Sequence, residues 1–449
     1  MAMATSKTNF LNVYCRWRPL VDSEVATGEI DRTTISDTSS LSSVSINRQS
    51  SPTDRLWKSA KAFKAIFEPD DDNAKVYNAI VAPAVVSVLQ GGTCSFFAYG
   101  HSGSGKTHTI IGYDYENDNS LGLCLGAARD LFQGIEPFNQ KHPQERLGIG
   151  FSLFELRKKS AFDLLNKRVE CHIREGPDGK THIRGPTETI EGGKVRVCPI
   201  VQHACWTFES FRQDLIKALG QRAVGSSSVH DQSSRTHAVL ELEIINQALV
   251  NGRQALYDRQ SELVPVGKRA TDISIEEQSK AAIRTPEGGW IPNPDYQVDQ
   301  ARIDAVEAEK AEFEARVTAA EEAINNILQA GGALGLGGKM VFVDLAGAEY
   351  HQEKGSQVNI LKQTPQEKQE GRQINSDLLA LKEVMRAWSK NLPRIPFRSS
   401  SLTMVLRQHF LDAEKGNSNM IVTVSPAKDQ YAATLNSLKY GSLVGASNA

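Results

Sequence analysis

The eight residues that decide the fold are Gly100-His101-Ser102-Gly103-Ser104-Gly105-Lys106-Thr107. They fit the phosphate-loop pattern G-x-x-x-x-G-K-[ST] and follow the apolar run 94–99, which is typical of a buried strand. Glycines let the backbone turn its N–H groups onto phosphates, Lys106 supplies a charge for the β- and γ-phosphates, and the Thr107 hydroxyl suits Mg²⁺. An ordinary glycine-rich turn needs neither a strand before it nor a helix after it. The sequence therefore predicts that the chain binds a nucleoside triphosphate.

A second segment, Gln232-Ser233-Ser234-Arg235-Thr236-His237, precedes an alternating run that is typical of a strand. A loop of this kind presents one hydroxyl, that of Ser234, to a metal ion and the other, that of Ser233, to an attacking water. On its own, such a turn is as often a solvated loop.

A third segment, 340–349, is a short apolar strand that ends in Asp344 and continues through Gly347 to Glu349. A strand-end aspartate suits Mg²⁺, and the N–H of the glycine suits a γ-phosphate. A strand-end aspartate is often only a cap. All three segments in this order favour an NTP-hydrolysing enzyme.

With these three segments the chain resembles the kinesin motor domain. Kinesins carry a phosphate loop of the form GQTGSGKT, a first switch NxxSSRSH and a second switch DLAGSE; this chain reads GHSGSGKT, HDQSSRTH and DLAGAE. Myosins share the architecture but differ in both switches. The resemblance covers residues 9–445 and is nearest in wording to the internal-motor, microtubule-depolymerising branch. Two departures bear on activity, because His230 replaces an Asn of the family and Ser401 replaces a Lys.

The resemblance implies a role for each motif residue. Lys106 would grip the β- and γ-phosphates, Thr107 and Ser234 would ligate Mg²⁺, and Asp344 would hold a metal-bound water. Gly347 would donate its N–H to the γ-phosphate, and a salt bridge between Arg235 and Glu349 would close the site. The implied contacts to ATP are Arg16, Arg18, Pro19, Gly100, His101, Ser102, Gly103, Ser104, Gly105, Lys106, Thr107 and His108.

Basic side chains are concentrated between Leu381 and Leu411, where Glu383 is the only acidic residue. They are Lys382, Arg386, Lys390, Arg394, Arg398 and Arg407. The first three stand at i, i+4 and i+8, so we expect them on one face of a helix. Such clusters are commonly solvated surface. Here the cluster coincides with the segment by which kinesins grip microtubules, whose surface is acidic, so we expect salt-sensitive binding to tubulin.

Residues 246–339 are an insertion within the motor domain. Its first half, 247–290, is polar, and we expect it to be irregular with a short helix opened by the capping pattern Ser274-x-x-Glu277. Its second half predicts a helix over 294–330, capped by Asn293 and ended by glycines. The apolar residues of that helix follow a heptad pattern interrupted by Lys310, and they are Ile303, Val306, Phe313, Val317, Ala320, Ile324 and Ile327.

Three arrangements of this long helix stay open. It packs on its own domain, it pairs with the segment before it, or it binds a protein partner or a second copy of the chain. The segment 294–330 carries nine acidic residues against three basic ones. An arm of this charge is not expected to lie on tubulin, because both surfaces are negative.

Composition agrees with a soluble intracellular enzyme, and the resemblance implies a microtubule-associated protein of the cytoplasm and cytoskeleton. The chain has 449 residues, 40% of them hydrophobic, and a net charge of −2, which argues against nucleic acid as the partner. There is no apolar run long enough for a bilayer and no signal peptide, so we expect no membrane contact. Six cysteines without metal-ligand spacing suggest reduced thiols. Residues 1–8 are expected to be disordered.

The expected fold is α/β, a P-loop NTPase motor domain with a mixed, mostly parallel central sheet flanked by helices, and with the nucleotide at the carboxyl edge of the sheet. The expected function is ATP hydrolysis with Mg²⁺, coupled to moving on or depolymerising microtubules. The alternative is an ATP-gated microtubule tether with weak turnover and an interaction arm. A third hypothesis, less favoured, is an ATPase that no longer binds tubulin. No dimerising coil follows residue 440, so we expect no two-headed walking from this chain alone.

Overall fold

The computed structural model describes residues 11–35, 41–47, 55–117, 120–176, 179–190, 194–222, 235–286, 288–331, 335–348, 365–411 and 417–446. It divides into two compact units. The first comprises residues 1–184, 200–245 and 332–449, and the second comprises residues 185–199 and 246–331. Most of the insertion therefore forms a unit of its own, to which residues 185–199 also belong.

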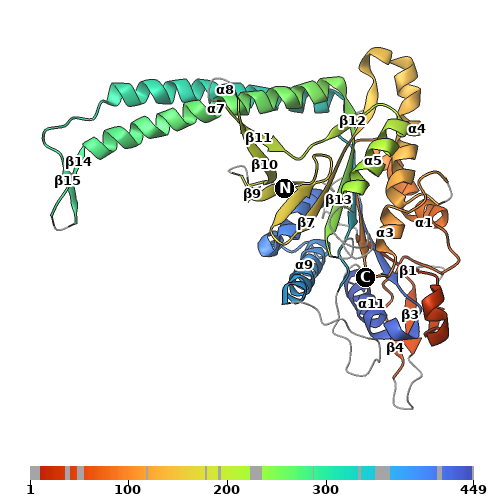
Figure 1. Ribbon diagram of the computed structural model, residues 1–449. Helices are drawn as coiled ribbons and strands as arrows, with labels where there is room; N and C mark the ends of the chain where they lie inside the picture. The colour runs from red at the N-terminus through yellow and green to blue at the C-terminus, as the bar shows by residue number, and fades with distance from the viewer. Residues whose placement is uncertain are drawn as a thin grey trace, which may run out of the picture. The chain divides into compact units, whose positions relative to one another are not determined.

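A mixed sheet organises the first unit (Figure 1). Its strands run in the order β10-β9-β8-β7-β13-β16-β6-β17-β1-β5, with β12 paired to β7. In the centre, β16, β6, β17, β1 and β5 are parallel, whereas β13 is antiparallel to β16 and β7 to β10 form antiparallel pairs. The bounds are β1 Leu11–Trp17, β5 Ala65–Phe67, β6 Thr93–Tyr99, β7 Leu147–Arg157, β8 Ser160–Asp163, β9 Val169–Glu175, β10 Thr181–Thr189, β12 His203–Cys205, β13 His237–Asn246, β16 Lys339–Asp344 and β17 Ser418–Val424. A separate small sheet has the order β2-β3-β4, with bounds Asp31–Ile35, Ser43–Asn47 and Trp57–Lys58.

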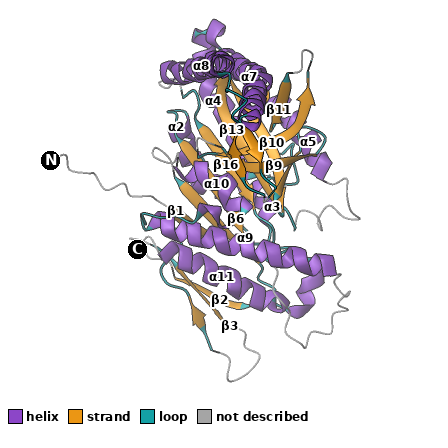
Figure 2. Cartoon of the chain, turned by 90° about the vertical axis from the view of Figure 1, so that its left-hand side faces the viewer, coloured by secondary structure: helices purple, strands orange, loops and turns teal. Residues whose placement is uncertain are grey.

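Helices cover both faces of this sheet (Figures 1 and 2). The bounds are α1 Asn73–Ile80, α2 Ala82–Val88, α3 Lys106–Ile110, α4 Leu123–Lys141, α5 Phe208–Arg222, α9 Pro365–Ser389, α10 Ser401–Leu411 and α11 Tyr431–Gly445. Side chains of β6 alternate between the faces: Phe96 stacks on Phe342 of β16, and Phe97 stacks on Phe410 of α10. Because every residue of β6 is buried, the strand needs cover on both sides. The predicted α/β fold is confirmed.

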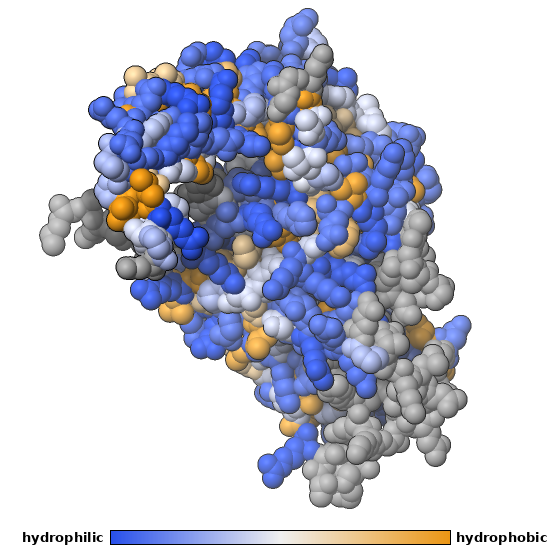
Figure 3. Space-filling model, turned by 60° about the vertical axis from the view of Figure 1, so that its left-hand side comes forward, coloured by the Kyte–Doolittle hydropathy of each residue, from blue (hydrophilic) through white to orange (hydrophobic). Residues whose placement is uncertain are grey.

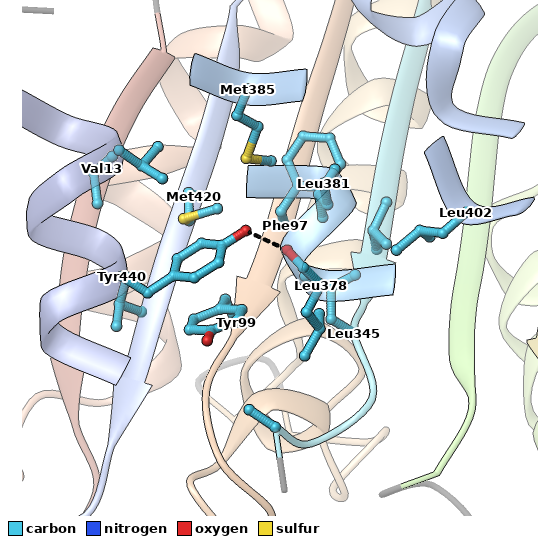
Figure 4. Close-up of a cluster of buried hydrophobic side chains, with 14 of the residues drawn as sticks. Val13, Phe97, Tyr99, Leu345, Leu378, Leu381, Met385, Leu402, Met420 and Tyr440 are labelled. Atoms are coloured by element: carbon cyan, nitrogen blue, oxygen red, sulfur yellow. Dashed lines mark hydrogen bonds between the residues drawn. The ribbon is translucent and has the colours of Figure 1, made fainter. Parts of the chain in front are cut away.

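A buried tyrosine joins α11 to α9 and to the sheet (Figure 4). The ring of Tyr440 stacks on that of Tyr99 at 3.8 Å between centroids. Its hydroxyl donates to the carbonyl of Leu378 at 3.2 Å. Leu381 and Met385 of α9 belong to the same apolar cluster. Helix α9 is therefore packed directly on the strand that leads into the phosphate loop.

The second unit contains two long helices that run side by side, α7 (Gln247–Lys280) and α8 (Gln300–Gly331), joined by the hairpin β14 (Ala282–Arg284) and β15 (Trp290–Pro292) (Figure 1). The prediction of an irregular segment over 247–290 was therefore wrong. Asn246 caps α7 by accepting the N–H of Leu249, and the helices approach closely at Gly252, where an added Cβ would lie 3.3 Å from Ile324. Of the three open arrangements, the structure has the antiparallel pair. Strand β11 (Val195–Pro199) also belongs to this unit.

Helix α8 begins later than the predicted residue 294. Asp299 accepts the N–H of Arg302 at 3.0 Å and caps the helix, whereas Asn293 donates to the carbonyl of Lys280 and belongs to the hairpin. The buried carboxylate of Glu277 accepts from the hydroxyl of Tyr296 and pairs with Arg302 at 2.7 Å. Those donors hold the pKa of Glu277 well below its ordinary value. The cap prediction failed because this charged cluster fixes the chain between the helices.

The surface in Figure 3 is mostly hydrophilic with scattered apolar side chains. Among the described residues, no helix combines the length and apolar character needed to cross a bilayer. All six cysteines are free thiols, as predicted.

Replacing residues 248–334 by a short Gly/Ser linker is expected to leave basal ATPase activity within about twofold of the parent's, because short connections between adjacent strands cost little. The two strands that this segment joins are neighbours, and the N–H of Ile244 donates to Gly338 at 3.0 Å. Steady-state ATPase and circular dichroism of the deletion variant test this. An unfolded product would show that the first unit needs the helical pair.

Candidate nucleotide site

The phosphate loop links the end of β6 to the start of α3. Gly105 takes the left-handed conformation, with φ of 99°, which favours glycine at this turn. Lys106 begins the helix and is 6% exposed, and its ammonium donates to the carbonyls of Gly100 at 3.2 Å and His101 at 2.8 Å. Burial lowers the pKa of Lys106 to about 8, so the side chain is still mostly charged at neutral pH. Among the described residues, the hydrogen bonds of this buried cation go to carbonyls, an arrangement that fits a phosphate.

Thr107 and Asp344 meet at the carboxyl edge of the sheet. The hydroxyl of Thr107 donates to Oδ2 of Asp344 at 2.8 Å, and Asp344 is the last residue of β16, in register with Ala98 of β6. Asp344 is 1% exposed, and its Oδ1 has no hydrogen-bond partner among the described residues. A hydroxyl beside an unsatisfied carboxylate oxygen suits Mg²⁺ and its bound water. The residues present therefore fit the metal that the phosphate loop implies.

Arg222, the last residue of α5, is a member of this site that no sequence motif indicated. Its Nε donates to Glu155 at 2.8 Å and its Nη1 donates to Oδ2 of Asp344 at 3.1 Å. The three side chains are between 1% and 7% exposed. Nη2 of Arg222 is buried without a partner among the described residues. Arg222 therefore fixes the carboxylate of Asp344 and adds a second buried cation beside Lys106.

The segment after β16 runs against the phosphate loop. At Gly347 an added Cβ would lie 2.8 Å from the backbone of Ser102, so only glycine fits this approach. The N–H of Ala348 donates to the carbonyl of Gly100 at 3.1 Å, and the N–H of Ala346 donates to Nδ1 of His237. Lys106, Thr107, Asp344 and Gly347, which the motifs singled out, thus lie together, and their roles toward a nucleotide stay predictions. The predicted residues Ser233, Ser234 and Glu349, and the departure His230, lie outside the described residues.

Arg235, the first described residue after that gap, lines a small cavity of about 10 Å³ with Arg157, Glu370 and Asp377. Its predicted salt bridge with Glu349 stays a prediction.

The four residues inside the phosphate loop divide into two kinds. His101 and Ser104 are buried: Nδ1 of His101 donates to the carbonyl of Ser102, and the hydroxyl of Ser104 lies 2.7 Å from that of Thr423. Burial lowers the pKa of His101 to about 4, so its ring is neutral at pH 7. Ser102 and Gly103 are exposed. Packing therefore fixes His101 and Ser104, whereas Ser102 and Gly103 form the exposed rim of the loop.

The two arginines expected around adenine, Arg16 and Arg18, both have hydrogen-bond partners within the protein. The guanidinium of Arg16 is buried, donating to Asn73 at 2.6 Å and Thr109 at 2.9 Å, so it ties β1 to α1 and α3. Nε of Arg18 donates to the carbonyl of Gly103, and Arg18 also pairs with Glu24 at 2.5 Å.

At the rim, the carbonyl of Pro19 accepts from Nη1 of Arg18. His108 is exposed and lies 5.6 Å from the ring of Tyr113, which is 54% exposed. This aromatic pair suits the face of a base, and no sequence motif indicated Tyr113.

The basic cluster on α9 and α10 has internal partners. Nζ of Lys382 lies 5.9 Å from the ring of Tyr440, and Arg386 pairs with Glu383 at 3.7 Å. Arg398 and Arg407 converge on Glu175 of β9, at 2.7 and 3.3 Å. Lys390 lies one residue past the end of α9, and Lys390 and Arg394 are exposed. The surface is therefore less positive than the sequence count suggests.

A model of the kinesin motor domain matches residues 16–267 and 315–446. The chain is 26% identical over 434 residues to the kinesin-like protein KIF24 of Homo sapiens, covering 97% of this chain and 23% of that protein. It is 27% identical over 436 residues to the kinesin-like protein KIN-13A of Oryza sativa subsp. japonica, covering 97% of this chain and 41% of that protein. The chain thus spans less than half the length of these curated relatives.

Two solved structures have a similar fold. One is the motor domain of the Kar3-like kinesin from Ashbya gossypii, with a TM-score of 0.58, 20% identity, and coverage of 97% of this chain and 99% of that one. The other is the C-terminal motor and motor homology domain of Kar3Vik1 fused to a synthetic heterodimeric coiled coil, with a TM-score of 0.60, 20% identity, and coverage of 97% and 84%.

Proposed function

Because the chain belongs to the kinesin motor domain family, we propose that it is an ATPase whose turnover is coupled to microtubules, on which it moves or which it depolymerises. One observation of the site carries this proposal. The ammonium of Lys106, the hydroxyl of Thr107 and the carboxylate of Asp344 lie together at the carboxyl edge of the sheet, and the Thr107 and Asp344 side chains are 2.8 Å apart. Within the cell, the proposal places the protein on microtubules in the cytoplasm.

The residues of the site divide the work of phosphoryl transfer. Lys106 would hold the β- and γ-phosphates, and Thr107 with Ser234 would hold Mg²⁺, which when bound neutralises charge on the phosphate oxygens. Asp344 would orient a water on that ion, and Arg222 holds the carboxylate of Asp344 in place through its ion pair at 3.1 Å. Such positioning, with charges already fixed before reaction, is the main source of catalysis in this class.

Closure of the site involves the two switch segments. Gly347 is already against the phosphate loop, so its N–H is available to a γ-phosphate. We assign Ser233 to the attacking water and the pair Arg235 and Glu349 to the salt bridge that forms with ATP bound. A switch of this kind couples the presence of the γ-phosphate to the position of distant elements.

Steady-state ATPase with and without microtubules tests the proposal. A motor hydrolyses ATP slowly alone and much faster with microtubules. A tether binds microtubules in an ATP-dependent way but shows little turnover in either condition. An ATPase that has lost tubulin turns over equally in both, and co-sedimentation with microtubules then finds no binding.

The tether is the second candidate, and the helical pair of the second unit favours it. On the hairpin that joins the helices, Trp290 is 67% exposed and Ile291 is 50% exposed. Large exposed apolar side chains are typical of protein contacts. On this hypothesis the pair is an arm that binds a protein partner or a second copy of the chain while the first unit holds the microtubule.

Neutralising Lys382, Arg386 and Lys390 together with alanine is expected to weaken microtubule binding about tenfold at low salt and to leave ATP binding unchanged, since exposed charges each contribute about 0.2–1 kcal/mol. Two of the three have internal partners, which limits the effect. Co-sedimentation across a salt series measures it.

The matched control for this triple variant neutralises three exposed cations elsewhere in the first unit, Lys141, Arg146 and Lys217. That control should bind microtubules like the parent. Identical curves for the parent and the Lys382, Arg386 and Lys390 variant would show that this face of α9 does not meet tubulin.

A further inference from the structure

The buried imidazole of His237 lies between the nucleotide site and α9. Among the described residues, only one of its two ring nitrogens has a hydrogen-bond partner. His237 starts β13, and its side chain is 4% exposed. Its Nδ1 accepts the N–H of Ala346 at 3.0 Å, so the proton of the neutral ring is on Nε2. Nε2 is buried and has no hydrogen-bond partner among the described residues. A buried donor without an acceptor is costly, so such a group calls for an explanation.

A buried carboxylate on α9 faces this nitrogen. Oδ2 of Asp377 lies 4.0 Å from Nε2 of His237, and the side chain of Asp377 is 5% exposed. A hydrogen bond between nitrogen and oxygen requires about 2.7–3.2 Å, so the two atoms are about 1 Å too far apart. Gln373 on the same helix donates to Oδ1 of Asp377 at 3.0 Å, and Ser400 is a further partner. The carboxylate is thus held in place, facing the imidazole.

We propose that His237 and Asp377 are a positioning pair: the Nε2–H of His237 donates to Asp377 when α9 moves about 1 Å toward β13, and α9 then moves with the loop at Ala346. The proposal rests on the proposed function, in which that loop senses the γ-phosphate and α9 carries part of the microtubule face. The imidazole is rigid and has a hydrogen-bonding atom on each side. Once both hydrogen bonds are formed, a movement of α9 therefore displaces the loop at Ala346 by nearly the same distance.

The charges around the pair determine its pH dependence. Arg157 and Lys158 come from β7 and the turn that follows it, and Arg235 lies two residues before β13. Glu370 comes from α9 itself, and Lys106 and Arg222 come from the nucleotide site. Burial, with Lys106 and Arg222, lowers the pKa of His237 to about 3, so the ring is neutral throughout the working range. Burial raises the pKa of Asp377 to about 6. As the pH falls through about 6, Asp377 gains a proton and becomes a weaker acceptor, so the link is strong above this pH and weak below it.

Two substitutions distinguish the effect of the charge of Asp377 from the effect of its ability to accept a hydrogen bond. Asp377→Asn keeps an acceptor that does not titrate, and Asp377→Leu removes the acceptor and puts an apolar side chain in its place. Ser376→Asn is the control, because it places a new amide one residue away on the exposed side of α9. Basal and microtubule-stimulated ATPase are measured for all four proteins between about pH 5.5 and 8, a range that spans the pKa shift expected for a buried carboxyl.

In the parent, the stimulated rate should fall as the pH drops through about 6. Asp377→Asn should flatten this profile. Asp377→Leu should lower the stimulated kcat about tenfold at pH 7.5 with the basal rate unchanged, as expected for loss of one hydrogen bond to a charged acceptor. The control should match the parent. A pH profile of Asp377→Asn equal to the parent's, or equal losses of basal and stimulated rates, would overturn the proposal.

A second readout needs no microtubules and so separates this inference from the proposed function. With a non-hydrolysable ATP analogue bound, hydrogen–deuterium exchange at residues 345–348 should be faster in Asp377→Leu than in the parent, since the loop loses its connection to α9. Equal exchange would overturn the pairing. An absence of microtubule stimulation in the parent, with the exchange difference present, would count against the proposed function alone.

Discussion

Lys106→Ala is expected to lower the kcat for ATP hydrolysis about 10³-fold and to weaken nucleotide binding sharply, because fixed charges aimed at a transition state carry most of the catalysis in phosphoryl transfer. The ammonium sits at the base of the phosphate loop and, within the part of the chain that the structure describes, donates to the carbonyls of Gly100 and His101. The effect of its removal on phosphate binding can therefore be measured separately from any effect on packing. Steady-state ATPase and titration with a fluorescent ATP analogue measure the two effects.

Stability provides the check on this interpretation. Burial lowers the pKa of Lys106 to about 8, so below that pH the folded protein carries a buried charge that costs stability relative to the unfolded chain. Removing the charge should thus not destabilise the protein at pH 7, and thermal unfolding should be close to the parent's. The control is Lys75→Ala, which removes an exposed lysine paired with Asp71. If Lys106→Ala hydrolysed ATP like the parent, the phosphate-loop assignment would be wrong.

Arg222→Ala should lower the free energy of unfolding by about 3–5 kcal/mol, the usual result of removing one partner from a buried ion pair. Glu155 and Asp344 are 2% and 1% exposed; Asp344 would lose its ion pair with Arg222, and Glu155 would keep the more distant Arg168 at 3.5 Å. Urea unfolding at pH 7 measures the loss. Hydrolysis should fall as well, because the carboxylate of Asp344 would no longer be held beside Thr107.

Two further variants test the cause. Adding Glu155→Gln to Arg222→Ala should recover part of the stability, since one buried carboxylate is then neutral. Arg212→Ala is the matched control on the same helix: this arginine pairs with Glu116 and Glu209 at the surface, and little change is expected. Equal stability of Arg222→Ala and the parent would contradict a structural role for the buried triad.

A residue of the site could be predicted from the sequence only when the residues that define its position lie close to it along the chain. Lys106 and Thr107 were found from the sequence because the backbone of one short loop determines where their side chains lie. Asp344 was found because a strand-end carboxylate in an apolar run is a local pattern. Arg222 was missed, since it is 67 residues from Glu155 and 122 from Asp344, and no local spacing relates them.

The same limit explains the errors in the insertion and in the basic cluster. Helix α7 contains Pro265 and two glycines, so its own residues do not favour a helix; packing against α8 supplies the stability that local propensity lacks. The count of basic residues on α9 and α10 could not include Glu175, which lies 223 residues before Arg398 and pairs with it.

The sequence by itself determined the nucleotide loop, the order of its three motifs and the family, because each depends on neighbouring residues whose geometry the backbone imposes. Only the tertiary structure decided which charges are neutralised and which polar groups lack partners. Burial and long-range contacts place Arg222 between two carboxylates, turn Arg16 inward and leave Nε2 of His237 facing Asp377. Electrostatic and hydrogen-bond energies depend on distance and burial in space, and those quantities exist only once the chain is folded.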